Sequence, residues 1–424
     1  MTLKSLLDSK KACFRYELMT AGSPEPLPVA ASGKVILMQP LEAESTPTGM
    51  LKIGTAVQTG QLLNADQPSG AVLSTATGTI VDLASYTGDY GRKFTAVTVS
   101  LSPEENWAPF TEKTPDIETL ARHFETGPGG AALSRFIRFR KSIKTIIIYG
   151  GDTDLLVETN LYVLKHHTEA VNRGIALLKQ ATGINTVVLA VPNESFQNFD
   201  GHFEADVIAM PNAYPGAQPL MIYCRHFGRR LEQGQSFESA GVWFVRAEAV
   251  AAMGRAVLEG RLPVDKIVTV LDKQGRKRLI SARIGTPVAD ILNRLNISLN
   301  NGDRLVLGGP MTGTAIYAES QPILPDTDAI MVQGRNDIIL SSDYPCINCG
   351  DCVRICPANV QVNMLVRFLE AGQYQDAADL YDLFSCVECG LCSFVCTARI
   401  PILQYIKLAK FELARLTPAE EENE

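Results

Sequence analysis

The chain has 424 residues and a formal net charge of −7. That length suggests about two to four domains, and the acidic balance argues against nucleic acid as a main partner. The sequence contains no run of 18 apolar residues, so we expect no membrane-spanning helix. Charged residues interrupt the first 19 positions, where a signal peptide would need an apolar core. We therefore predict a cytoplasmic protein that reaches a membrane only through a partner.

Residues 1–112 are predicted to form a β-rich domain. Short apolar runs alternate with glycines, which is typical of small sandwiches and barrels. The pattern from Gly54 to Leu63, followed by Ser74–Gly78, resembles the barrel-sandwich hybrid of lipoyl and biotinyl domains. Those domains carry a modified lysine at a hairpin tip, and Ser74–Gly78 contains no lysine. We therefore expect a structural domain without a swinging arm.

Residues 113–262 are predicted to form a Rossmann-like α/β domain. Apolar runs at 144–149, 186–191 and 206–210 read as buried strands, and apolar residues recur at helical spacing from Asn160 to Thr182. Gly183 follows as the expected C-terminal cap. A strand, a helix and a strand at this spacing form a βαβ unit, so we expect a parallel sheet with helices on its faces.

Two smaller units are predicted to follow. Residues 263–325 alternate strands with one short helix and suggest an α+β module of β-grasp type, and 321–343 reads as a linker. Residues 326–424 are predicted to be helical, with segments at 364–369, 376–384 and 403–416. In the last helix we expect Lys407, Lys410 and Arg415 to face solvent.

Eight of the ten cysteines lie between positions 346 and 396, in two runs of the form C-x₂-C-x₂-C-x₃-C. The runs are Cys346, Cys349, Cys352 and Cys356, then Cys386, Cys389, Cys392 and Cys396. This is the spacing of bacterial ferredoxins, which bind two [4Fe–4S] clusters. Zinc sites and purely structural clusters are the alternatives, but zinc favours well-separated CxxC pairs.

The fourth cysteine of each run begins a segment that leads away from its own loop, so we expect it to bind the other cluster. Cluster one then takes Cys346, Cys349, Cys352 and Cys396, and cluster two takes Cys386, Cys389, Cys392 and Cys356. The first run ends in Cys356-Pro357, but the second ends in Cys396-Thr397. A hydrogen bond from Thr397 is expected to alter a cluster potential.

The order of these units resembles the RnfC subunit of the Rnf ion-translocating electron-transport complex. The resemblance rests on the cysteine motifs, on R-I-G-T-P at 283–287 and on G-G-P-M-T-G at 308–313. It implies that the β-grasp module is of the SLBB type. It further implies a protein on the inner face of the cell membrane that takes electrons from NADH through FMN. Two clusters would pass these electrons to membrane subunits that translocate ions.

The flavin motif of that family is only partly present. Gly127, Gly129 and Gly130 match its glycine-rich loop, and Asp152 and Asp154 stand where the family has two glutamates. These five residues are the candidates for cofactor binding. The glycines would allow close backbone approach to a phosphate, whereas the two carboxylates would either contact the ligand or be solvated at a strand end. The last glycine of the loop is replaced by Ala132, and the Phe-Pro-Thr that follows in the family is absent. A retained flavin site and a lost one both stay open, and so does the chain's own NADH oxidation.

Two other functions compete with the Rnf-like one. The first is a soluble NADH flavoenzyme similar to the cobalamin reductase of propanediol microcompartments, although that relative lacks the N-terminal barrel. The second is an adaptor without flavin that docks another electron donor, such as a ferredoxin-type protein or a cytochrome, onto the membrane complex.

Overall fold

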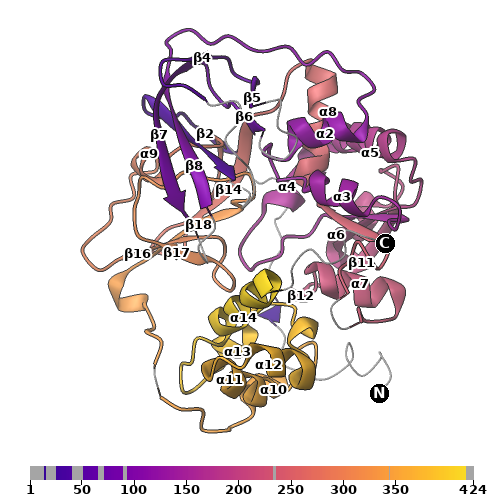
Figure 1. Ribbon diagram of the computed structural model, residues 1–424, viewed down its shortest axis with the longest axis vertical. Helices are drawn as coiled ribbons and strands as arrows, with labels where there is room; N and C mark the ends of the chain where they lie inside the picture. The colour runs from indigo at the N-terminus through magenta and orange to yellow at the C-terminus, as the bar shows by residue number, and fades with distance from the viewer. Residues whose placement is uncertain are drawn as a thin grey trace.

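The computed structural model describes residues 25–416 apart from 41–50, 65–70, 89–92, 233–234 and 343, together with the backbone of 14–15. The acidic C-terminal tail and most of the N-terminal stretch considered for a signal peptide lie outside the described residues. Figure 1 shows β-rich parts on the left, an α/β part on the right and a helical C-terminal part below them. This mixed, multidomain architecture agrees with the predicted fold class, whereas the domain boundaries remain predictions.

The N-terminal part is built on a four-stranded antiparallel sheet. Its order is β3 (Lys34–Pro40), β8 (Lys93–Leu101), β7 (Gly78–Thr87) and β4 (Ala56–Val57). The short strands β5 (Leu62–Leu63) and β6 (Val72–Leu73) form a second sheet. Buried and exposed residues alternate along β3, which places Val35 and Leu37 in a core with Ile80, Val97 and Val99.

The α/β part contains a parallel sheet, as the βαβ pattern predicts. Its order is β11 (Asp206–Met210), β10 (Val187–Pro192), β9 (Thr145–Tyr149) and β13 (Val242–Arg246). Helices α2 (Ile117–Phe124), α3 (Leu133–Phe139), α5 (Thr168–Thr182) and α8 (Ala247–Glu259) share one core with the sheet. Helix α7 (Pro219–Phe227) packs on the other face through Ile222 and Tyr223. Helices on both faces explain the continuous apolar strands.

The single helix predicted from Asn160 to Thr182 is wrong in one respect. The chain forms α4 (Thr159–His166) and then α5, with a break at His167, where φ is −124° and ψ is 35°. The Thr168 hydroxyl donates to the Leu164 carbonyl at 3.0 Å, a side-chain bond that competes with the helical pattern. Helix α5 does end at Gly183 in the left-handed conformation, as predicted.

A six-stranded sheet forms the core of the region predicted as a β-grasp module. Its order is β17 (Thr314–Ile316), β16 (Arg304–Leu307), β18 (Ala329–Gln333), β14 (Asp265–Leu271), β15 (Lys277–Arg283) and β2 (Leu27–Val29). Helix α9 (Val288–Arg294) packs on it. Strand β18 lies inside the stretch predicted as a linker, so that prediction is wrong for residues 329–333. Its apolar residues complete the sheet between β14 and β16.

The C-terminal part is helical, as predicted. It contains α10 (Asp351–Ile355), α11 (Val362–Glu370), α12 (Tyr374–Tyr381), α13 (Leu391–Phe394) and α14 (Ile402–Leu416). Leu365, Ile406 and Ala409 are fully buried where α11 and α14 pack together. Helices α10 and α13 each begin directly after a glycine with positive φ, Gly350 and Gly390, so each glycine turns a cysteine loop into a helix.

Candidate iron–sulfur centres and the crevice of the parallel sheet

The first candidate centre is a cavity with four cysteines in its wall. Three come from the first run and one from the second: Cys346, Cys349, Cys352 and Cys396. Val366 of α11, Ile402 at the start of α14 and Ile400 just before it supply apolar lining. Burial, together with negative charge on the other three thiols, raises the pKa of Cys352 to about 11. The four side chains therefore lie within electrostatic reach of one another.

The second candidate centre gathers the other four cysteines. Burial, together with negative charge on Cys386 and Cys356, raises the pKa of Cys389 to about 12. Burial also raises the pKa of Cys392, and negative charge on Cys386, Cys389 and Cys356 contributes to the rise. Each set of four thus contains three cysteines of one run and the last cysteine of the other. Thiols with such raised pKa values become thiolates only when a metal replaces the proton.

The two centres differ in exposure. Cys349 of the first set is exposed, whereas Cys356, Cys389 and Cys392 of the second set are buried. The described residues contain no group of three or more His, Cys, Asp or Glu side chains placed to hold a single metal ion. Each of the two sets offers four sulfur donors, which suits iron–sulfur clusters because their ligands are thiolates.

Lys410 lies beside the second set. The prediction that it faces solvent is wrong. Its ammonium donates to the Cys386 carbonyl at 2.9 Å and to Glu388 at 2.8 Å. The same charge opposes the rise in the pKa of Cys386, so it stabilises negative charge on that sulfur. At the first set the Thr397 hydroxyl donates to Cys349 Sγ at 3.9 Å, the kind of contact that the sequence suggested.

Replacing Lys410 with Gln is expected to lower the reduction potential of the second cluster. The reduced cluster carries one more negative charge, which the ammonium stabilises. A loss of about 1 kcal/mol for one electron corresponds to a shift on the order of 50 mV. A redox titration followed by electron paramagnetic resonance measures it. Lys410→Arg should keep most of the wild-type potential, and Arg415→Gln, at the exposed end of α14, should leave both potentials unchanged. A rise in potential would contradict this role of Lys410.

The cysteine region docks on the rest of the molecule through the second cysteine loop. The Tyr214 hydroxyl donates to the Cys389 carbonyl at 2.6 Å. A Cβ atom added at Gly390 would lie 2.4 Å from the Met311 carbonyl oxygen, so only glycine permits this approach. Lys407, also predicted to be solvated, donates to the Thr312 carbonyl at 3.0 Å. The loop 308–313 thus lies between the cysteine region and the α/β part.

In the parallel sheet the strand order reverses between β9 and β13, and the carboxyl ends of these two strands border a crevice. Ligands of open α/β sheets bind at such a switch point. In this protein, charged side chains lie at this switch point and pair with one another. Arg246, at the end of β13, forms an ion pair with Asp328, and Lys266 forms ion pairs with Asp328 and Glu248. Lys266 is fully buried.

Asp152 and Asp154, predicted to bind a cofactor, have partners within the chain. The N–H groups of Asn160 and Leu161 donate to Asp152 at 2.8 and 3.4 Å, where α4 begins. Asp154 accepts from the N–H groups of Met311 and Thr312 at 3.1 and 2.8 Å. The two carboxylates therefore order α4 and the loop 308–313.

The glycine-rich loop is also covered. The Gly129 N–H donates to the Pro325 carbonyl at 2.9 Å, and the Gly130 N–H donates to the Gly127 carbonyl at 3.0 Å. A Cβ atom at Gly129 would lie 2.5 Å from the backbone nitrogen of Ala249, so close packing on α8 requires a glycine here. A phosphate needs free N–H groups. Gly127, Gly129, Gly130, Asp152 and Asp154 thus do not fit a flavin at this crevice.

Asp152 gives a pH dependence that can be measured. Burial raises its pKa from 3.8 to about 7, although the N–H donors oppose the rise. The unfolded chain releases this proton first, so stability should fall as pH increases from about 4 to about 7 and then level off. Asp152→Asn should reduce the loss between pH 5 and pH 8 by about 2 kcal/mol. Urea unfolding at several pH values tests this, with the exposed substitution Asp206→Asn as control. Equal slopes for wild type and Asp152→Asn would contradict it.

Comparison with known proteins agrees with the iron–sulfur interpretation. A family model described as "4Fe-4S dicluster domain" matches residues 345–400. Curated proteins described as the C subunit of the ion-translocating oxidoreductase complex match most of the chain. The protein of Edwardsiella ictaluri is 27% identical over 90% of this chain and 51% of its own length. Those of Yersinia enterocolitica and Rhodobacter capsulatus are each 26% identical, over 94% and 92% of this chain and 61% and 79% of their own lengths.

The chain is similar to these C subunits along most of its length. The predicted resemblance to RnfC is thereby confirmed, and residues 345–400 form the dicluster region. The chain spans about half to three fifths of the length of the first two relatives. Among solved structures, a chain of an NAD⁺-reducing [NiFe]-hydrogenase covers 75% of this chain and 69% of its own at 13% identity and a TM-score of 0.48. That likeness is too weak to assign a fold or a function.

Sequence reasoning missed the residues that close the crevice. No role was predicted from the sequence for Arg246, Lys266 or Asp328. Lys266 and Asp328 lie 20 and 82 positions from Arg246, so no local pattern connects them. A lysine and an arginine next to otherwise apolar strands were the one signal available, because such residues are almost never buried unpaired.

Proposed function

We propose that this chain is a peripheral electron-transfer subunit of an Rnf-like ion-translocating complex. The observation that carries the proposal is the formation of two four-cysteine sets, each drawn from both sequence runs. When bound, two [4Fe–4S] clusters would supply one-electron transfer. Similarity to C subunits along most of the chain supports the same role.

The chain's residues have distinct tasks in this proposal. Cys346, Cys349, Cys352 and Cys396 would hold the first cluster, and Cys356, Cys386, Cys389 and Cys392 the second. Apolar side chains of α11 and α14 line the first set, in which Cys349 remains exposed. Lys410 neutralises charge at the second set. The close approach at Gly390 keeps the second set against the loop 308–313.

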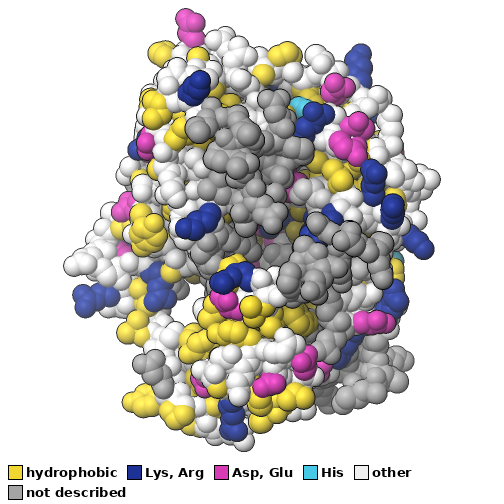
Figure 2. Space-filling view, in the orientation of Figure 1, with side chains coloured by type: hydrophobic (Ala, Val, Ile, Leu, Met, Phe, Trp, Pro, Cys, Tyr) yellow, Lys and Arg dark blue, Asp and Glu magenta, His cyan; other side chains and the backbone are white. Residues whose placement is uncertain are grey.

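Membrane attachment would come through partner subunits. The described residues contain no helix that is both long and apolar enough to cross a membrane. Large apolar side chains are exposed next to the first cysteine run: Ile339, Leu340, Tyr344 and Ile347. Figure 2 shows apolar side chains gathered over the dicluster region. Exposed apolar groups of this kind mark protein interfaces, so this end of the dicluster region would contact other Rnf-like subunits on the inner membrane face.

The adaptor without a flavin at the sheet crevice is the second candidate. The ion pairs of Arg246 and Lys266 and the partners of Asp154 favour it, because they occupy the position that FMN and NADH would need. The donor would then be another redox molecule or protein, such as a ferredoxin-type protein or a cytochrome. A soluble NADH flavoenzyme of cobalamin-reductase type would need the same crevice and is disfavoured for the same reason.

Metal analysis of anaerobically purified protein tests the proposal. We expect about eight iron and eight acid-labile sulfide per chain, four of each in each cluster. Cys224→Ser, outside both runs, should keep all of the iron. Stoichiometric zinc, or half of the expected iron, would contradict the two-cluster proposal. Co-purification with membrane subunits in mild detergent tests the peripheral role, and a protein that never sediments with membranes would favour the soluble enzyme.

A further inference from the structure

The carboxylate of Asp154 holds the loop 308–313 through four hydrogen bonds. Asp154 is only 5% exposed. One of its oxygens accepts from the N–H groups of Leu155 and Met311 at 2.7 and 3.1 Å. The other accepts from the N–H and the hydroxyl of Thr312 at 2.8 and 2.6 Å. Burial raises the pKa of this carboxyl, but these donors oppose the rise. Backbone N–H groups can only donate, so the arrangement suits the ionised carboxylate.

The loop is shaped to receive this carboxylate. A Cβ atom added at Gly309 would lie 2.4 Å from the carboxyl carbon of Asp154. Gly309 does not have a positive φ, so the close approach and not the backbone conformation requires a glycine here. The Gly313 N–H donates to the Gly309 carbonyl at 3.0 Å and closes the loop between β16 and β17. A single added methyl group would therefore displace the carboxylate.

One peptide unit carries this contact to the second cysteine loop. The peptide between Met311 and Thr312 presents its N–H to Asp154. Its carbonyl oxygen lies against Gly390, where an added Cβ atom would be 2.4 Å away. The N–H and C=O of a trans peptide point in opposite directions, so the carboxylate determines which of the two faces Gly390. A reversed peptide would direct its carbonyl oxygen toward the carboxylate, and the two negative groups would repel each other.

Apolar packing joins the same elements. Leu155, which follows Asp154 directly, and Met311 both pack against a buried cluster formed by Tyr214, Ile355, Cys389 and Leu391. Two members of this cluster stand on either side of Gly390 in the chain. The position of the carboxylate is therefore coupled to the second cysteine loop through side chains as well as through the backbone.

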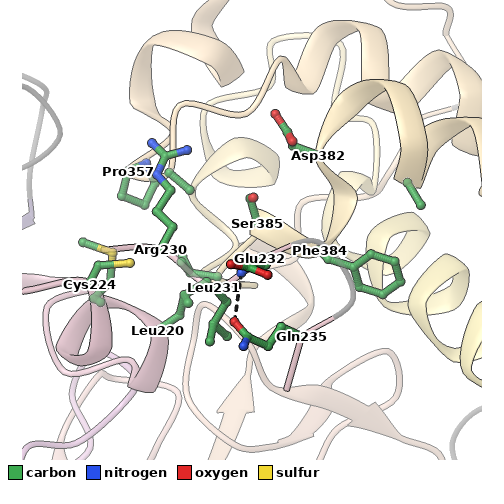
Figure 3. A pocket seen from close by; sticks show the side chains of 14 residues that line it. Leu220, Cys224, Arg230, Leu231, Glu232, Gln235, Pro357, Asp382, Phe384 and Ser385 are labelled. Carbon is green, nitrogen blue, oxygen red and sulfur yellow. Dashed lines mark hydrogen bonds between the residues drawn. The ribbon is translucent and has the colours of Figure 1, made fainter. Parts of the chain in front are cut away.

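On the side of α7, a pocket borders the second cysteine set. The pocket has a volume of about 240 Å³, and its lining includes the residues on either side of Cys386. Figure 3 shows Leu220 and Phe384 on opposite sides of it. An open pocket constrains its walls less than close packing does, so the contacts with the loop 308–313 fix the second set more firmly than those at α7.

We propose that Asp154 is a positioning residue of the second cluster: its carboxylate keeps the Met311 carbonyl against Gly390 and so lowers the reduction potential of that cluster. The inference rests on the proposed function, because it needs the cluster. A carbonyl oxygen beside the cysteine loop carries partial negative charge and disfavours the additional electron of a reduced cluster, whereas an N–H group favours it. Among the described residues that line the first set, none belongs to the loop 308–313, so the first potential is independent of Asp154.

Redox titration of the protein with full iron content, followed by electron paramagnetic resonance, tests the proposal. Both oxygens of Asp154 face backbone N–H groups, so an Asn side chain would place its NH₂ group against one of them in either orientation. In Asp154→Asn the ratio of reduced to oxidised second cluster at a fixed potential should rise at least about threefold, equivalent to about 30 mV for one electron. The signal of the second cluster is the one that Lys410→Gln shifts, and the other signal should not change.

Three further variants separate position from charge. Gly309→Ala keeps the carboxylate but displaces it, and Thr312→Val removes only the hydroxyl donor. Both should raise the second potential, and the shift in Thr312→Val should be the smaller one. Asp152→Asn is the matched control, because Asp152 is also a buried carboxylate after β9 but accepts its backbone hydrogen bonds from α4. It should leave both potentials unchanged. The iron content and melting temperature of each variant are compared with wild type.

Three results would overturn the inference. One is an unchanged second potential in Asp154→Asn with full iron content. Another is an equal shift of both potentials, which would indicate a general loosening, and the third is a shift of the same size in Asp152→Asn. If Asp154→Asn loses iron, Gly309→Ala and Thr312→Val decide, and an unchanged second potential in both contradicts the proposal. A failure of the proposed function would instead appear as missing iron in the wild-type protein.

Discussion

Replacing Cys349 and Cys396 together with Ala is expected to remove one cluster and leave the other. Both side chains line the same cavity, although they come from different sequence runs. The double variant should keep roughly half of the iron, about four atoms per chain. Replacing Cys389 and Cys396 together, which stand in one run but in different sets, should remove nearly all of it.

The comparison separates crossed from uncrossed ligation. If each run held its own cluster, the pattern would reverse, and the Cys389 and Cys396 pair would keep half of the iron. Iron and sulfide analysis of anaerobically purified variants gives the count, and electron paramagnetic resonance of the reduced protein identifies the cluster that remains. Cys224→Ser serves as the control for the loss of a cysteine outside both sets.

Removing Lys266 is expected to destabilise the fold more than any other single charge change considered. Glu248 and Asp328 would be left buried without their common cation. Burial alone would lower the pKa of Lys266, but these two carboxylates raise it above its ordinary value. Breaking a buried ion pair by removing one partner costs about 3–5 kcal/mol. Chemical unfolding of Lys266→Ala should show a loss of that size.

Two further variants define the cause. Arg255→Ala removes a partly exposed ion pair with Glu259 and should cost at most about 1 kcal/mol. Combining Lys266→Met with Glu248→Leu should recover most of the loss, because apolar replacement of both partners is often neutral. A cost for Lys266→Ala as small as that of Arg255→Ala would show that the network does not hold the crevice closed.

The parts of the fold with a regular pattern could be predicted from the sequence. The apolar runs of β9, β10 and β11 and the cysteine spacing each depend on residues that are close in the chain. The crossing of Cys356 and Cys396 followed from the known geometry of such motifs, and the structure draws the same sets together. Periodicity failed at His167, because the periodic pattern continues through a single non-helical residue.

The crevice could not be predicted for a different reason. The glycines and carboxylates at 127–130 and 152–154 are compatible with a phosphate site and with internal packing, and the sequence does not reveal their partners. Only the fold brings Pro325 to Gly129 and Thr312 to Asp154. Lys410 was misjudged in the same way, since its contact with Cys386 joins two elements 24 positions apart.

The contacts that fix the second cysteine loop have a consequence for the rate of electron transfer. The Tyr214–Cys389 hydrogen bond and the contact of Gly390 with Met311 hold the loop, and the bond from Lys407 to Thr312 holds the neighbouring helix α14. A carrier domain on a flexible tether would deliver electrons at a rate that depends on its diffusion and hence on solvent viscosity. Here the gaps between redox centres are set by packing, so the internal transfer rate should be independent of viscosity.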